Sequence, residues 1–210
     1  MIKKLLTRFK NRTPKTPAPV PGWLRVTHWL NVVAVTLMVL SGWRIYDASP
    51  VFSFRIPPGI TLGGWLAGGL QWHFAAMWLL FTNGLFYLGM NIATGRMKTK
   101  YLPLSAKELW HDIRQTLRLK LHHDDLSHYN MIQKLSYLFA IAALVMIVLS
   151  GLVMWKSVQF PHLRALLGGY DSARVIHFIC MSLIVAFTFV HVVMVAVVPR
   201  TLKGMILGRF

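Results

Sequence analysis

Four long apolar runs dominate the chain and are separated by polar segments. They cover about residues 24–46, 71–94, 132–155 and 173–198. About twenty apolar residues in a helix cross the hydrocarbon core of a bilayer, so each run is long enough to do so. Backbone polar groups in lipid must be satisfied within the chain, which a helix achieves by itself. The pattern therefore predicts an all-α integral membrane protein, built as a bundle of four transmembrane helices.

A shorter amphipathic segment follows the second run. Ser105 and Glu108 form a capping-box pattern at its start. An apolar stripe then recurs at helical spacing: Leu109, Trp110, Ile113, Leu117 and Leu121. A basic helix of this kind is expected to lie on the membrane surface. The loop over residues 47–70 is rich in Pro, Gly and aromatic residues, which favours a docking surface over a segment lying along the membrane interface.

Lysine and arginine are distributed unevenly around the four runs. Eighteen lie before the first run, between the second and third, and after the fourth, whereas five lie in the other two loops. Positive charge concentrates on the cytoplasmic side, so both termini are predicted there. We expect a basic, proline-rich cytoplasmic tail at residues 1–22, the membrane domain at 23–200, and a second cytoplasmic tail at 201–210. The bacterial inner membrane is the expected location.

The composition excludes several classes of protein. Hydrophobic residues make up 55% of the chain and charged residues 14%, which is too apolar for an ordinary soluble domain. The net charge of +17 comes from segments between the runs, with no basic stripe interleaved with stacking aromatics, so nucleic-acid binding is not expected. The lone cysteine, Cys180, excludes an internal disulfide, an iron–sulfur cluster held by this chain alone, and covalently attached haem.

Four histidines lie within the apolar runs, where ionisable side chains are costly and usually functional. His177 and His191 are fourteen residues apart in the fourth run, which places them roughly 21 Å apart along one face of a helix. His28, just inside the first run, should lie at the level of His191. His73, early in the second run, should lie at the level of His177. Depth therefore pairs these imidazoles across the bundle.

Two imidazoles at each level favour haem over other metal centres. Zinc and non-haem iron sites need further thiolate or carboxylate ligands, and the four runs contain no acidic residue. A histidine bonded to a neighbouring carbonyl remains the alternative for any one of the four. Taken together, the matched depths predict two b-type haems, one between His28 and His191 and one between His73 and His177.

Further candidate contacts flank these histidines. Gly42 follows His28 by fourteen residues, where it could let a flat cofactor approach the backbone or could allow close packing of helices. Arg25 and Arg174 each precede a histidine by three residues, and Arg44 closes the first run. These guanidinium groups could neutralise haem propionates. For Arg25, simple flanking of a membrane span is an equal alternative.

These motifs together resemble one known family. They are R-V-T-H-W and V-L-S-G in the first run, a histidine opening the second, H-Y-N-M-I-Q-K before the third, and H-x13-H in the fourth. The chain resembles, from Pro21 onward, the bacterial di-haem cytochrome b family, also called prokaryotic cytochrome b-561. That family includes membrane subunits of Ni,Fe-hydrogenases, formate dehydrogenases and thiosulfate reductases. The ending K-G-M-I-L-G-R also looks like the family's ending.

The resemblance implies a two-haem path between a periplasmic redox partner and the membrane quinone pool, with ubiquinone or menaquinone as the diffusible partner. His73 and His177 would ligate the periplasmic-side haem, and His28 and His191 the cytoplasmic-side haem. A Y-N-x-x-Q-K stretch borders a quinone site in the family, and here the matching residues are Tyr129, Asn130 and Gln133. His128, beside them, would be either a proton relay or a contact to lipid headgroups.

The partner implied is a periplasmic oxidoreductase subunit. The first loop looks more like that of cytochromes associated with periplasmic molybdenum enzymes. An alternative within the family is a stand-alone superoxide:quinone oxidoreductase, which would need a cationic funnel formed by the basic residues of the two periplasmic loops: Arg44, Arg55, Lys156, Arg164 and Arg174. A haem-free membrane anchor is the third hypothesis.

Overall fold

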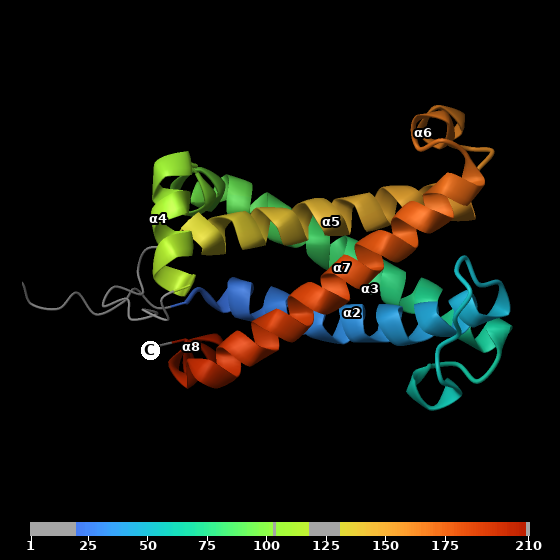
Figure 1. Cartoon of the computed structure of the whole chain (residues 1–210), viewed down its shortest axis with the longest axis horizontal. Helices are drawn as coiled ribbons and strands as arrows, with labels where there is room; N and C mark the ends of the chain where they lie inside the picture. The colour runs from blue at the N-terminus through green and yellow to red at the C-terminus, as the bar shows by residue number, and fades with distance from the viewer. Residues whose placement is uncertain (1–19, 103, 118–130, 209–210) are drawn as a thin grey trace, which may run out of the picture.

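The computed structural model describes residues 20–102, 104–117 and 131–208, and within them the chain is helical with no strand (Figure 1). Four of the helices are long and apolar enough to cross a membrane. They are α2 (Gly22–Ala48), α3 (Leu66–Ala93), α5 (Met131–Trp155) and α7 (Tyr170–Val197). The predicted all-α membrane bundle is confirmed.

Shorter elements lie at the two ends of this bundle: η1 (Pro58–Ile60), η2 (Met97–Tyr101), α4 (Ala106–Leu117), α6 (Pro161–Leu166) and α8 (Pro199–Leu207). Helix α4 crosses the end that also carries α8, whereas α6 lies at the opposite end (Figure 1). The predicted cap of α4 is present, because the Glu108 amide donates to Ser105 Oγ at 3.4 Å. Trp110 of its apolar stripe is exposed and lies under the Arg114 guanidinium, while Leu121 lies outside the described residues.

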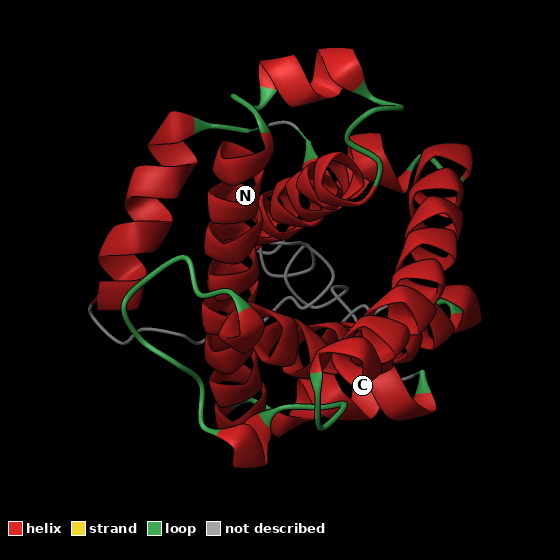
Figure 2. Cartoon of the chain, turned by 90° about the vertical axis from the view of Figure 1, so that its right-hand side faces the viewer, coloured by secondary structure: helices red, strands yellow, loops and turns green. Residues whose placement is uncertain are grey.

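The long helices form two pairs. Helix α2 packs most extensively against α3, and α5 packs most extensively against α7, with far less backbone contact between the pairs. The view along the bundle shows the helices arranged around a centre (Figure 2). A small core of Ala143, Ile147 and Ile184 joins α5 to α7. Many large apolar side chains are exposed, as expected for helices that face lipid.

A buried amide joins α2 to α3 near one end of the bundle. Asn83 Nδ2 donates to the Thr27 carbonyl at 2.9 Å and to Asn31 Oδ1 at 2.7 Å. Asn83 is 6% exposed. The alternative to these bonds inside a bilayer is an unsatisfied polar group, so the amide fixes how the two helices face each other. The backbone of Thr27 is thereby held one residue before His28.

Helix α3 begins at Leu66, five residues before the predicted start of the second run. The intervening glycines, Gly68 and Gly69, resemble a loop in sequence but are helical and buried. A Cβ on Gly63 (φ 109°) would overlap the backbone of Gly68 and Gly69, and a Cβ on Gly68 would overlap the Gly63 carbonyl, so the loop can pack against the first turn of α3 only because Gly63 and Gly68 lack side chains. The early start therefore depends on a close backbone approach.

The C-terminal segment, predicted as a short basic tail, forms helix α8 instead. Pro199 occupies its first position, where the missing amide is not needed. Arg25 Nη1 donates to the Ile206 carbonyl at 2.9 Å, and Trp29 Nε1 donates to the Met205 carbonyl at 3.2 Å. These bonds attach the end of the chain to the start of α2. The orientation of the termini and the predicted domain limits stay predictions.

Candidate functional site

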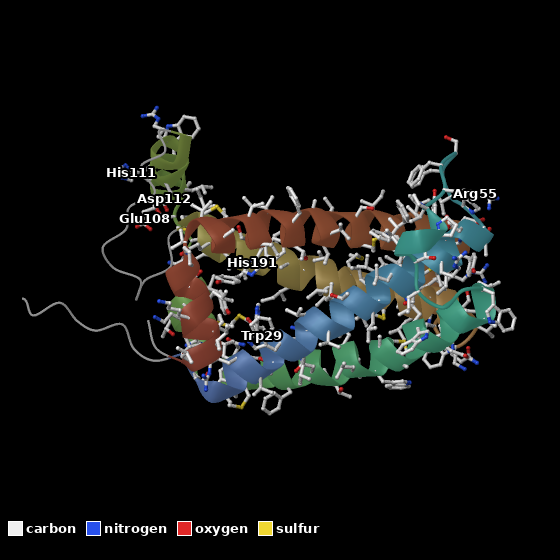
Figure 3. The ribbon with its side chains drawn as sticks, turned by 90° about the horizontal axis from the view of Figure 1, so that it is seen from below. Trp29, Arg55, Glu108, His111, Asp112 and His191 are labelled. Atoms are coloured by element: carbon white, nitrogen blue, oxygen red, sulfur yellow. The ribbon has the colours of Figure 1, made fainter. Side chains whose placement is uncertain are left out.

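His28 of α2 and His191 of α7 lie close together. Their ring centres are 6.0 Å apart and the ring planes are inclined by 62°. The Phe187 ring is nearly parallel to His191, and Trp29 is edge-on to His28. Figure 3 shows His191 and Trp29 toward the end of the bundle that carries α4. The structure thus brings together the first pair that depth predicts.

His73 of α3 and His177 of α7 form a second close pair. Their ring centres are 6.3 Å apart, with the planes inclined by 59°. Hydrogen bonds hold one nitrogen of each ring: His73 Nδ1 lies 3.1 Å from Ser41 Oγ, and His177 Nδ1 lies 3.1 Å from Ser150 Oγ. Neither Nε2 atom makes a hydrogen bond to another residue that the structure describes.

Both separations suit a pair of axial haem ligands. A metal–imidazole bond is about 2 Å long and the ring centre lies about 1 Å further out, so two imidazoles on opposite sides of one metal have centres about 6 Å apart. The observed values of 6.0 and 6.3 Å agree with this spacing. Within the described residues, no three His, Cys, Asp or Glu side chains gather as a metal site. Two imidazoles alone suit a metal whose remaining ligands come from a porphyrin.

Two glycines lie against the His73–His177 pair. A Cβ on Gly42 would lie 3.4 Å from His73 Cε1, and a Cβ on Gly151 would lie 3.4 Å from His177 Cε1. Gly42 of α2 therefore faces the imidazole ring of His73 on α3. Sequence reasoning named Gly42 but not Gly151, although the repeated V-L-S-G pointed to both.

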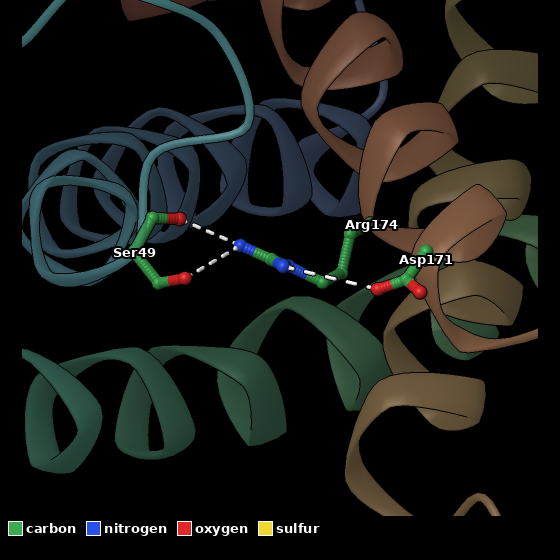
Figure 4. Close-up of polar contacts among 3 residues, drawn as sticks. All are labelled: Ser49, Asp171 and Arg174. Carbon is green, nitrogen blue, oxygen red and sulfur yellow. Dashed lines mark hydrogen bonds and ion pairs between the residues drawn. The ribbon is translucent and has the colours of Figure 1, made fainter.

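The candidate arginines differ in their partners. Arg25 and Arg44 each have a buried Nε that makes no hydrogen bond to the described residues. These atoms lie at opposite ends of α2 and could donate to an acidic group. Arg174 instead donates to the Ser49 carbonyl at 2.6 Å and lies 4.0 Å from the exposed carboxylate of Asp171 (Figure 4). The loop after α2 is thus tied to the start of α7.

The predicted quinone motif is only partly described. Tyr129, Asn130 and His128 lie outside the described residues, whereas Gln133 is exposed in the first turn of α5. The amide of Met131 donates to Asp112 Oδ2 at 2.7 Å, which fixes α4 to the start of α5.

The remaining histidines lie in the segments between the four apolar runs, where their side chains are expected to face solvent. His111 and His162 are exposed and lie on helices α4 and α6, outside the four long helices. Figure 3 labels His111 beside Glu108 and Asp112 on α4. His122 and His123 lie outside the described residues.

An aromatic cluster covers the loop end of the His73–His177 pair. Tyr46 stacks on Phe178, the neighbour of His177, with ring centres 4.6 Å apart. The Tyr46 hydroxyl lies 3.0 Å from the Phe54 carbonyl and 3.3 Å from the Phe52 carbonyl. Phe52 and Phe54 are 41% and 48% exposed. The loop therefore presents rigidly held aromatic side chains at this end, which also carries Arg55 (Figure 3).

Comparison with known proteins agrees with this geometry. Residues 20–208 match the family described as prokaryotic cytochrome b561. A relative from Azospira oryzae (strain ATCC BAA-33 / DSM 13638 / PS), named putative protein-methionine-sulfoxide reductase subunit YedZ1, is 65% identical over 189 residues, which cover 90% of this chain and 96% of the relative. The chain therefore belongs to the prokaryotic cytochrome b561 family, and it is a multi-pass electron-transfer protein of the bacterial inner membrane with a b-type haem cofactor.

Proposed function

We propose that this chain transfers electrons between the quinone pool and a periplasmic oxidoreductase subunit through two b-type haems. One haem would be held by His28 and His191, and the other by His73 and His177. The observation that carries the proposal is the presence of two imidazole pairs, 6.0 and 6.3 Å between ring centres, at two levels of one bundle. Each bound haem would supply one-electron redox chemistry.

The chain's own residues set the distance between these two sites and could bind the propionates. Because His177 and His191 are fourteen residues apart on α7, their sites are roughly 21 Å apart along the helix. The rigid helix keeps this distance constant. Arg25 and Arg44, one near each end of α2, would donate from their buried Nε atoms to propionates. Arg174 is already bonded to Ser49, so we assign it to the loop and not to a propionate.

The quinone would be oxidised or reduced near the His28–His191 pair. Gln133 and the residues just before it, Tyr129 and Asn130, would border that site. Support comes from the bond between Met131 and Asp112, which holds the start of α5 against α4 at this end of the bundle.

The proposed partner is an oxidoreductase subunit docked at the His73–His177 end. The relative from Azospira oryzae is named as a reductase subunit, which favours a multi-subunit assembly here. The exposed Phe52 and Phe54 also favour docking. Arg55 donates to the Asp47 carbonyl and Arg174 to Ser49, so both side chains are attached to this loop. That the partner contains molybdenum stays a prediction.

Haem counting in histidine variants tests the two-haem proposal. Purified protein should contain two b-type haems per chain. The variants His177→Ala and His28→Ala should each lose one haem, and the midpoint potential of the remaining haem should differ between the two variants. His162→Ala, at an exposed histidine of α6, should retain both. Two haems in His177→Ala, or fewer than two in the unaltered protein, would overturn the proposal. Quinol-driven reduction of the remaining haem then tests which end the quinone uses.

A further inference from the structure

The two helix pairs repeat one local arrangement around the His73–His177 pair. In α2 the residues Val39 to Gly42 are V-L-S-G, and the same four residues stand at Val148 to Gly151 of α5. Helices α3 and α7 each have 28 residues, and His73 and His177 are both the eighth residue of their helix. The α2–α3 pair is thus repeated by the α5–α7 pair, with one histidine from each pair.

The contacts of the two histidines match in detail. Each Nδ1 lies 3.1 Å from a serine hydroxyl, Ser41 for His73 and Ser150 for His177. Each Cε1 lies 3.4 Å from the Cβ position of the glycine that follows that serine. Both serines are fully buried. Each of the two helix pairs therefore places the same serine and glycine contacts around one imidazole ring.

The hydrogen-bond network determines where the imidazole protons lie. Ser150 Oγ donates its hydrogen to the Met146 carbonyl at 2.7 Å, so its oxygen accepts from His177. The Ile147 carbonyl, which can only accept, lies 3.1 Å from the same Nδ1. His177 therefore carries its proton on Nδ1 and presents an unprotonated Nε2.

The same reasoning applies to the other ring. Ser41 Oγ donates its hydrogen to the Leu37 carbonyl at 2.6 Å, so its oxygen accepts from His73 Nδ1 at 3.1 Å. His73 thus also has its proton on Nδ1 and its lone pair on Nε2. Both Nε2 atoms are then available to a metal held between the rings, as a metal-ligating histidine requires.

The His28–His191 pair lacks this support. Its rings contact aromatic side chains, Trp29 and Phe187, and no hydrogen bond joins either ring to another described residue. The two levels therefore differ in the hydrogen-bonded acceptors behind their histidines. A bond from Nδ1–H to an acceptor raises the electron density of the imidazole and favours the oxidised metal.

We propose that Ser41 and Ser150 are positioning residues that fix the ring orientation and protonation of His73 and His177 and so lower the midpoint potential of the haem they hold. The inference rests on the proposed ligation of a haem by these two histidines. The serines act through the imidazoles and do not themselves bind the metal. The repeat gives each serine the same role toward its own histidine.

Redox titration and low-temperature EPR of Ser41→Ala, Ser150→Ala and the double variant test this inference. Each single substitution should raise the midpoint potential of one haem only and move the largest g-value of that haem, and the double variant should show the sum of the two shifts. The matched control is Ser136→Ala in α5, whose hydroxyl donates to the Ile132 carbonyl at 2.8 Å as Ser150 does to Met146. It should change neither readout.

Further outcomes separate failure of this inference from failure of the proposed function. Fewer than two b-type haems in the unaltered protein would overturn the proposed function itself. Two haems whose potentials and g-values stay unchanged in all three alanine variants would overturn only the role of the serines, as would equal shifts of both haems. Ser150→Cys keeps a polar group at the same position but weakens the acceptor, so it should shift the same haem in the same direction even if Ser150→Ala does not fold.

Discussion

Replacing Asn83 with leucine should weaken the attachment of α3 to α2. Asn83 is 6% exposed and donates two hydrogen bonds, to the Thr27 carbonyl and to Asn31 Oδ1. Hydrogen bonds between membrane helices contribute about 0.6 kcal/mol on average and about 1.7 kcal/mol at most. Loss of two such bonds should therefore lower the free energy of unfolding by about 1 kcal/mol, and by no more than about 3 kcal/mol.

Equilibrium unfolding in mixed micelles, followed by loss of helical circular dichroism, measures this free energy. The matched control is Thr82→Ala, one residue away on α3, whose exposed hydroxyl bonds only within its own helix, to the Trp78 and Leu79 carbonyls. That control should change the unfolding free energy by less than about 0.5 kcal/mol. A double-mutant cycle between Asn83→Leu and Asn31→Leu should give a coupling of about 0.6 kcal/mol.

Equal unfolding free energies for Asn83→Leu and Thr82→Ala would refute this reasoning, because the amide would then contribute nothing between the helices. Loss of the Asn83 amide should also change the position of His28, because the Thr27 carbonyl that it binds immediately precedes this histidine. In Asn83→Leu the EPR spectrum of the haem assigned to His28 and His191 should therefore broaden, while that of the other haem stays unchanged.

Three further predictions concern the ends of the bundle. Gly63→Ala should lower the unfolding free energy by more than about 2 kcal/mol, because Gly63 has a φ of 109° and an added Cβ would overlap neighbouring backbone. The control Gly59→Ala should have little effect, because the space around its Cβ position is open. Tyr46→Phe should lose about 1 kcal/mol of local stability and increase hydrogen exchange over residues 52–54; unchanged exchange would mean that the hydroxyl does not hold the loop. Arg25→Ala combined with Trp29→Phe should release α8, measured as faster proteolysis after residue 198, and an unaltered cleavage rate would contradict the attachment.

Much of this protein follows from its sequence because the governing interactions are local or depend on depth. Continuous apolar length predicts the four spans, since a bilayer admits few other structures. The helical rise places His177 and His191 at two levels of one helix and pairs them with His73 and His28. The family motifs identify the class of cofactor.

Only the tertiary structure decided which side chains form hydrogen bonds with the Nδ1 atoms of His73 and His177. The hydrogen bond from His177 to Ser150 joins residues far apart in sequence, and the matching contact of His73 with Ser41 could not be predicted because V-L-S-G alone fits ordinary helix packing. The attachment of α8 to Arg25 and the early start of α3 likewise depend on contacts between distant segments. Hydropathy records how deep a residue lies in the membrane, but the direction in which its side chain points toward a neighbouring helix is set by packing.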